Sequence, residues 1–162
     1  MRMIAFMALA GAGLALAAFA AEPEAAALSA GANAAFLVDN AKKAGVVSAP
    51  GIQYEVLKKG NGEQPSRHDC VTVYYKGSLI DGKVFDQTEE GKPAVFPANL
   101  LIPGWVEALQ MMHVGDKWRL VIPSGLAYGR EGAGDGLIPP DQTLVFEIEL
   151  LKAAPQTTRG CV

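Results

Sequence analysis

The sequence has few of the residues that most metal and redox sites use, with only two cysteines and two histidines among 162 residues. These four residues are scattered, without a His-x-x-x-His or Cys-x-x-Cys spacing, so we expect no metal site and no bound cofactor. The Gly-x-Ser-x-Gly motif of hydrolases and the Walker loop of nucleotide-binding proteins are also missing. The common sequence templates for metal, thiol, serine and nucleotide chemistry are therefore excluded.

The chain also has little charge. Charged residues make up 19% of it, and the formal net charge at pH 7 is −3. It contains no run of basic residues that could neutralise phosphates. We therefore expect neither a nucleic acid nor an anionic membrane surface as partner.

One long apolar run stands at the N-terminus. Residues 1–20 combine Arg2, an alanine-rich apolar stretch and the small-x-small sequence Ala18-Phe19-Ala20. This pattern is typical of a secretory signal peptide, so we expect cleavage after Ala20 and export. The alternative is an uncleaved membrane anchor, because the run nearly reaches the length that spans a bilayer. Only in that case would the protein be attached to a membrane.

Residues 21–43 are expected to form a linker followed by a short helix. The first part is rich in alanine, and the helical pattern starts at Asn33, a residue suited to capping a helix N-terminus. Two lysines suit the negative end of the helix dipole, and Gly45 can stop the helix.

The two cysteines, Cys70 and Cys161, lie in contrasting surroundings. Cys70 opens an apolar segment, whereas Cys161 lies in the polar C-terminal tail, residues 154–162. An even number of cysteines in an exported protein suggests a disulfide. The surroundings instead favour Cys70 as a small core residue and Cys161 as a free or intermolecularly paired thiol. An intramolecular bridge, and a redox role for the pair, remain as alternatives.

Residues 44–153 show the pattern of one domain, with its core at 67–153. Four segments in it alternate apolar and polar residues, which predicts an antiparallel sheet covering a core. These segments are centred near Tyr54, Val73, Leu120 and Ile148. Between them, Pro103–Met112 carries apolar residues at helical spacing, starting at Trp105. The sequence therefore predicts an α+β fold in which a curved antiparallel sheet wraps around one short helix.

A glycine-rich stretch, YGREGAGDGLIPP, spans residues 128–140. A dinucleotide-binding loop would need a further glycine at position 137, which is Leu, and a helix directly after it. Here Ile-Pro-Pro and an apolar strand follow instead. The stretch is therefore not a phosphate-binding loop.

Six aromatic residues and one nearby acid remain as candidates for a site. Their spacing fits an ordinary aromatic core, and it equally fits the walls of a pocket in which Tyr and Trp keep their polar tips accessible. The aromatic residues are Tyr75, Phe85, Phe96, Trp105, Tyr128 and Phe146, and the acid is Asp86.

Four segments carry a family pattern: VYYKGSLIDGKVFD (73–86), IPGWVEALQMMHVGDKWRLVIP (102–123), LAYGREGAGDGLIPP (126–140) and TLVFEIELL (143–151). Together they resemble the FK-binding-protein (FKBP) type of peptidyl-prolyl cis-trans isomerase. The segments before them resemble the exported, macrophage-infectivity-potentiator-like bacterial branch, which implies the periplasm as the destination of the exported protein. The resemblance implies an antiparallel half-barrel around one helix, and an enzyme that assists protein folding in the cell envelope. The alternative is a module that binds proline-containing segments with little turnover.

The resemblance also implies a pocket between the sheet and the helix. Its catalytic residues would be Tyr75, Phe85, Asp86, Trp105, Tyr128 and Phe146, and its substrate-binding residues would be Leu101, Ile102, Leu137 and Ile138, the last two in a flap. The implied partners are proline-containing polypeptides, with macrolide inhibitors as candidate ligands. Ala94 and Asp135 depart from the family pattern at the rim and the flap. Because few residues precede the sheet, we expect a monomer.

Overall fold

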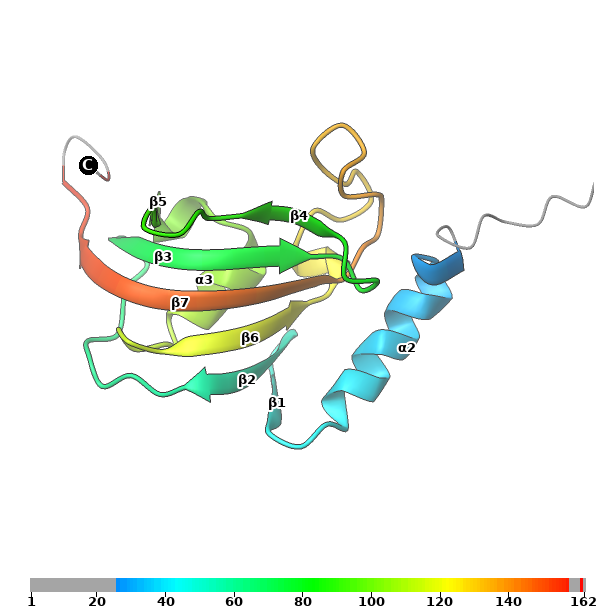
Figure 1. The fold of residues 1–162 in the computed structure, drawn as a ribbon, viewed down its shortest axis with the longest axis horizontal. Coiled ribbons are helices and arrows are strands. Elements are labelled where there is room, and N and C mark those ends of the chain that lie inside the picture. Colours follow the sequence, from blue (N-terminus) through cyan, green and yellow to red (C-terminus); the bar gives the residue numbers. More distant parts are fainter. Residues whose placement is uncertain (1–25, 158–160, 162) are drawn as a thin grey trace, which may run out of the picture.

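The computed structural model describes residues 26–157 and residue 161 (Figure 1). The expected signal peptide, residues 1–20, lies outside the described residues, as does the first part of the expected linker. No helix in the described part of the chain combines the length and the apolar composition needed to cross a membrane.

In the described residues, seven strands form one antiparallel sheet in the order β1-β2-β6-β7-β3-β4, and β5 also pairs with β3. The strands are β1 (Val46–Ala49), β2 (Ile52–Lys58), β3 (Asp69–Ser78), β4 (Val84–Gln87), β5 (Ala94–Pro97), β6 (Lys117–Ile122) and β7 (Leu144–Pro155). The four predicted strands are confirmed as β2, β3, β6 and β7. The sequence did not reveal β1, β4 and β5, because four residues are too few to show a clear alternation.

Helix α3 (Pro103–Leu109) lies behind the sheet in Figure 1 and packs on its concave face. Its predicted apolar stripe is buried, with Trp105 4%, Leu109 1% and Met112 0% exposed. Two short 3₁₀ helices, η1 (Ala98–Leu100) and η2 (Ser124–Leu126), flank α3 and β6 along the chain. The core lies between α3 and the inward faces of the central strands, which confirms the predicted α+β fold.

The far end of α3 is fixed by one buried acid. The side chain of Asp116 is 6% exposed, and its two carboxylate oxygens accept from the Gly60 amide at 2.6 Å and the His113 amide at 2.7 Å. These bonds join the segment after β2 to the turn between α3 and β6. Hydrogen bonds to a buried carboxylate are stronger than neutral ones, so they fix the turn that follows α3 relative to the segment after β2.

The N-terminal helix begins earlier than the sequence predicted. Helix α2 spans Ala30–Ala41, and its N-cap is Ser29, whose hydroxyl accepts from the Ala32 amide at 3.2 Å. The prediction that Asn33 caps this helix is wrong. Asn33 lies inside the helix, 5% exposed, because its amide group is taken up by hydrogen bonds to the loop before β7.

The expectation that Cys161 is free or intermolecularly paired is also wrong. Cys70 and Cys161 form a disulfide, with their Cα atoms 5.4 Å apart. The reason is the pairing of β3 with β7, in which Cys70 lies opposite Ala154. The chain that leaves β7 at Pro155 therefore starts beside Cys70. This neighbourhood depends on the strand order, which the cysteine spacing does not reveal.

Candidate functional site

A cavity of about 290 Å³ opens between the concave face of the sheet and the N-terminal end of α3. We call it the aromatic cavity. Eight of the ten residues predicted for the site line it, and Phe96 and Leu100 complete the lining. The eight are Tyr75, Phe85, Asp86, Leu101, Ile102, Trp105, Tyr128 and Phe146.

Trp105 lies at the centre of the aromatic side chains. Its ring makes edge contacts with Tyr75 at 5.4 Å, Phe146 at 5.3 Å and Phe96 at 6.3 Å between centroids. Phe85 meets Phe146 edge-on at 5.6 Å. Edge-to-face packing is a favourable arrangement of aromatic rings, so the rings hold one another in place. The cavity therefore has a fixed apolar floor and fixed apolar walls.

Gly77 on β3 allows two of these walls to meet. A Cβ atom at this position would lie 2.6 Å from Phe85 Cζ and 2.7 Å from Phe146 Cε1. No larger residue fits there without displacing one of the rings. The Tyr-x-Gly pattern contains this glycine, but the sequence did not identify it as part of the site. A glycine inside a strand, which often marks a close approach, was the available signal.

The polar groups of the cavity divide into one engaged pair and two free donors. The Tyr75 hydroxyl donates to Asp86 Oδ2 at 2.5 Å. Tyr128 is 40% exposed, and its hydroxyl has no hydrogen-bond partner within the described residues. The Ile102 amide, at the N-cap of α3, likewise donates to none of them. A ligand in the cavity can therefore accept two hydrogen bonds without displacing an existing one.

Both tyrosines of the cavity stay protonated at neutral pH. Burial, followed by the hydrogen bond to Asp86, raises the pKa of Tyr75 well above the usual value near 10. Burial, followed by the negative charge of Asp86, raises the pKa of Tyr128 in the same direction. The Tyr128 hydroxyl thus remains a hydrogen-bond donor over the physiological pH range.

An absorbance titration should show this for Tyr75. The phenolate absorbance of Tyr75 is the difference between the titration curves of the unmodified protein and the Tyr75→Phe variant. We expect this difference to appear only above pH 10. Because the folded-state pKa is raised, the stabilisation from the neutral phenol is fully present below pH 10 and is lost as the pH rises through the folded-state pKa. A phenolate signal at or below pH 10 would show that Tyr75 is neither buried nor paired as described.

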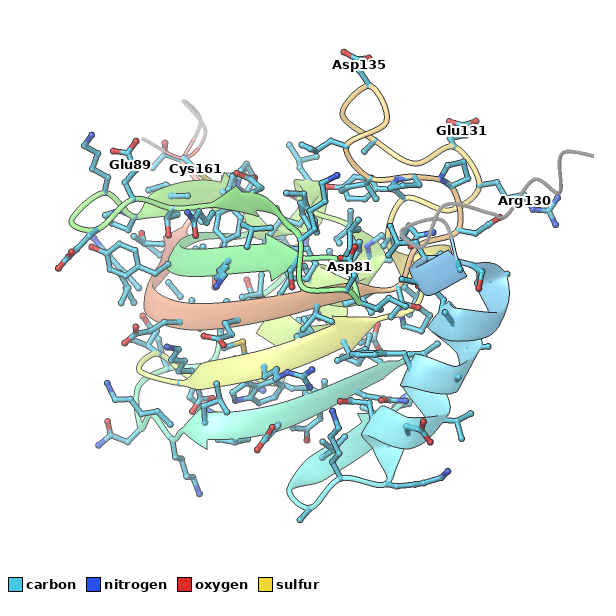
Figure 2. The ribbon with its side chains drawn as sticks, turned by 45° about the vertical axis from the view of Figure 1, so that its right-hand side comes forward. Asp81, Glu89, Arg130, Glu131, Asp135 and Cys161 are labelled. Atoms are coloured by element: carbon cyan, nitrogen blue, oxygen red, sulfur yellow. A yellow bond between two sulfur atoms is a disulfide. The ribbon has the colours of Figure 1, made fainter. Side chains whose placement is uncertain are left out.

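The two predicted flap residues lie apart from the cavity lining. Ile138 is 5% exposed and packs in the core, held by hydrogen bonds in both directions with Ala133 at 3.0 Å. Leu137 is 45% exposed on the same loop, whose tip carries Asp135 into solvent (Figure 2). The glycines of this loop adopt positive φ angles, which lets it turn back on itself.

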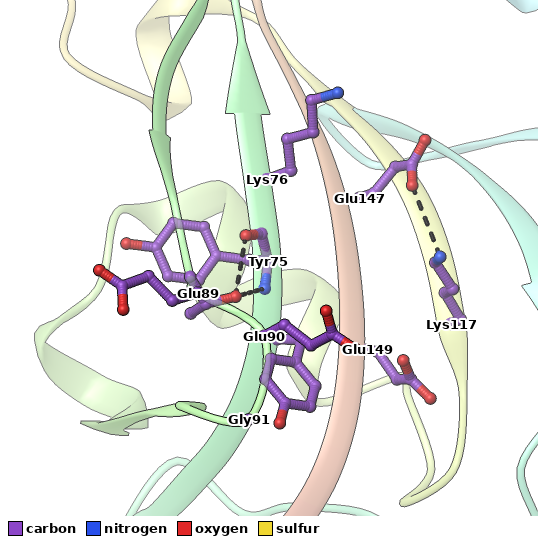
Figure 3. Close-up of a pocket in the computed structure, with 10 residues that line it drawn as sticks. Tyr75, Lys76, Glu89, Glu90, Gly91, Lys117, Glu147 and Glu149 are labelled. Atoms are coloured by element: carbon purple, nitrogen blue, oxygen red, sulfur yellow. Dashed lines mark hydrogen bonds and ion pairs between the residues drawn. The ribbon is translucent and has the colours of Figure 1, made fainter.

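A larger cavity, about 580 Å³, lies on the outer face of the sheet, beneath the connection between β4 and β5 (Figure 3). Charged side chains line most of it, and Lys117 pairs there with Glu147 at 3.6 Å. It has neither the converging rings nor the apolar floor of the aromatic cavity. Within the part of the chain that the structure describes, no three His, Cys, Asp or Glu side chains gather to hold a metal.

Comparisons with known proteins agree with the geometry. The FKBP-type peptidyl-prolyl cis-trans isomerase family matches residues 61–151. The FKBP-type 22 kDa peptidyl-prolyl cis-trans isomerase of Escherichia coli is 56% identical over 119 residues, which are 72% of this chain and 57% of that protein. The outer membrane protein MIP of Legionella longbeachae is 50% identical over 119 residues, 72% of this chain and 51% of that protein. The chain thus spans little more than half the length of these curated relatives.

A solved structure gives the same result for the fold. The crystal structure of a peptidyl-prolyl cis-trans isomerase from Pseudomonas syringae matches with a TM-score of 0.72 and 47% identity, covering 82% of this chain and 97% of that one. With its sheet wrapped around α3 and its aromatic cavity between them, the chain belongs to the FKBP-type peptidyl-prolyl cis-trans isomerase family.

Proposed function

We propose that this protein catalyses the cis-trans isomerisation of X–Pro bonds in polypeptides, in the aromatic cavity. The observation that carries the proposal is the ring cluster around Trp105, open at one side and bordered by two free hydrogen-bond donors. A prolyl ring is apolar and compact, so it suits such a cavity. The family membership and the relatives' names support the same activity.

The chemistry needs no nucleophile, because the barrier to X–Pro rotation comes from amide resonance and is about 18–20 kcal/mol. Resonance places negative charge on the carbonyl oxygen, and this charge separation collapses as the C–N bond twists. The twisted amide is therefore less polar than the planar one. A dry aromatic cavity favours it, whereas water favours the planar form. The cavity would lower the barrier by binding the transition state more tightly than the ground state.

The remaining groups hold the substrate backbone. The Tyr128 hydroxyl and the Ile102 amide would donate to carbonyl oxygens flanking the proline. Asp86 is engaged with Tyr75 and would fix that ring against the floor, so its role is to organise the wall. No proton transfer is required of it.

A protease-coupled assay tests the activity. A short proline-containing peptide is offered to a protease that cleaves only its trans form, and the slow phase reports isomerisation. We expect the protein to accelerate this phase in proportion to its concentration. Binding of the peptide without acceleration would contradict the proposal and would instead favour a proline-binding module.

The Gly77→Ala variant should lose most of this activity. The added Cβ overlaps Phe85 and Phe146, so at least one of these two cavity walls must move, and overpacking of this kind costs about 1–3 kcal/mol of folding stability. A displaced wall no longer encloses the prolyl ring, and we expect kcat/KM to fall about fivefold to hundredfold. Gly125→Ala is the matched control, because a Cβ there meets no atom within 4 Å. Unchanged kcat/KM in Gly77→Ala would show that the contact between the two rings does not matter.

The setting of the activity is also a proposal. Three observations support a role in folding proteins in the cell envelope: the signal-like segment at residues 1–20, the Cys70–Cys161 disulfide and the name of the Legionella relative.

Macrolide inhibitors are candidate ligands of the cavity, although Ala94 leaves a smaller rim. We further propose that the protein is a monomer, which size-exclusion chromatography tests.

A further inference from the structure

Helix α2 docks on the domain through polar side chains. Its two buried residues are Asn33, 5% exposed, and Asn40, 1% exposed, whereas its Val38 is 57% exposed. The two asparagines are seven residues apart, so they lie on one face of the helix. Buried amides hold an interface only in the geometry that satisfies their hydrogen bonds. The docking of α2 is therefore specific in position.

Asn33 attaches α2 to the segment that ends the glycine-rich loop. Its Oδ1 accepts from the Thr143 amide at 2.8 Å, and its Nδ2 donates to Gln142 Oε1 at 3.2 Å. Gln142 in turn donates from Nε2 to the Leu28 carbonyl at 3.1 Å and the Pro140 carbonyl at 2.9 Å. Figure 2 shows the N-terminal end of α2 beneath the loop that carries Arg130 and Glu131.

The same segment is bonded to the residue beside Tyr128. The Asp141 amide donates to the Gly129 carbonyl at 2.8 Å, and the Gly129 amide donates to the Ser124 carbonyl at 2.9 Å. Asp141 has a φ of 60°, a conformation that neighbouring contacts must maintain in a residue with a side chain. Hydrogen bonds from Asn33 to residues 142 and 143, the short backbone of residues 140–143 and the bond from Asp141 to Gly129 thus connect α2 to the backbone next to Tyr128.

We infer that Asn33 is a positioning residue for Tyr128, acting through the Asp141–Gly129 contact, and that α2 is therefore part of the isomerase machinery. The inference rests on the proposed function. The Tyr128 hydroxyl makes no hydrogen bond to the described residues, so the backbone beside it must set its position. A donor has to stay within about 0.5 Å of its productive place to keep its effect on the rate.

The Asn33→Ala variant tests this against a control in the same helix. We expect kcat/KM for a prolyl peptide to fall roughly twofold to tenfold, and by no more than in Tyr128→Phe, because the variant weakens the one hydrogen bond that the Tyr128 hydroxyl donates. Asn40→Ala is the control, because Asn40 docks the other end of α2 on Gln53 at 2.8 Å and Arg119 at 2.8 Å. It should leave kcat/KM unchanged. Equal losses in both variants would reduce Asn33 to a structural role and overturn the inference.

A double variant separates positioning from general loosening. In a Tyr128→Phe background, Asn33→Ala should change kcat/KM by less than about twofold, because the hydroxyl that it positions is already gone. A full additional loss would overturn the inference. If Asn33→Ala does not fold, Gln142→Ala takes its place, because it removes the bond between Gln142 and Asn33 and the bonds from Gln142 to the Leu28 and Pro140 carbonyls.

Amide hydrogen exchange supplies a readout independent of turnover. The Asp141 amide should exchange faster in Asn33→Ala than in the unmodified protein, and at an unchanged rate in Asn40→Ala. Unchanged exchange in Asn33→Ala would overturn the inference even if turnover fell. If the unmodified protein does not isomerise prolyl peptides, the proposed function fails, while the exchange rates still show whether Asn33 holds the loop.

Discussion

Replacing Phe85 with Ala is expected to lower kcat/KM for a prolyl peptide roughly tenfold to hundredfold, the equivalent of about 1.5–3 kcal/mol for one aromatic side chain that the bound substrate covers. Phe85 forms a wall of the aromatic cavity and contacts Phe146 edge-on. Without its ring, water reaches the bound amide and stabilises the planar form. Trp105→Ala should act in the same direction, but Trp105 is also a core residue, so Phe85 gives the clearer result. Steady-state kinetics with the protease-coupled assay measures both.

Two further variants serve as comparisons for Phe85→Ala. Tyr128→Phe removes one hydrogen bond and should cost only about twofold to tenfold. Val84 precedes Phe85 in the chain, but its side chain is 39% exposed and does not line the cavity. The Val84→Ala variant should therefore leave kcat/KM unchanged. If a folded Phe85→Ala protein kept full turnover, the cavity would not be the site of isomerisation.

Breaking the disulfide between Cys70 and Cys161 is expected to give the largest loss of stability. It closes a loop with a sequence separation of 91, and removing such a crosslink typically costs about 2–5 kcal/mol of unfolding free energy. For a domain of this size that corresponds to a fall in Tm of roughly 6–15 °C. Thermal unfolding of a Cys70→Ser, Cys161→Ser double variant, followed by circular dichroism, measures it.

Reductant provides the control for this experiment. It should lower the Tm of the unmodified protein to that of the double variant, and it should leave the double variant unchanged. Neither cysteine lines the aromatic cavity, so kcat/KM below the unfolding transition should be the same in the oxidised and reduced proteins. An unchanged Tm would contradict the crosslink, and a loss of turnover without unfolding would restore the redox role.

The sequence predicted the parts of the fold in which apolar residues recur at the spacing of a strand or a helix. The apolar alternation around Val73 and Ile148 identified β3 and β7, and the helical spacing from Trp105 identified α3. The family motifs in the sequence also supplied ten predicted site residues, and eight of these ten line one cavity. The predictions of β3, β7 and α3 succeeded because local pattern and burial agree along the central strands and the helix. The roles of the cavity residues stay predictions.

What the sequence did not reveal depends on contacts between distant segments. Cys70 can bond to Cys161 only because β3 runs beside β7. Asn33 does not cap its helix, because its side chain accepts a hydrogen bond from the Thr143 amide. Gly77 is required by two rings that approach it from other strands. Ile138 turns into the core because its loop folds back on Ala133. Spacing along the chain contains no information on any of these approaches.

Exchange NMR on a proline-containing peptide, with the protein at catalytic concentration, tests the central claim most directly. It measures the rate of interconversion between the cis and trans forms at equilibrium, together with their ratio. We predict that the protein accelerates the exchange and leaves the ratio unchanged, and that Phe85→Ala loses most of the acceleration. Peptide resonances that shift on binding while the exchange rate stays at its uncatalysed value would contradict catalysis in the aromatic cavity.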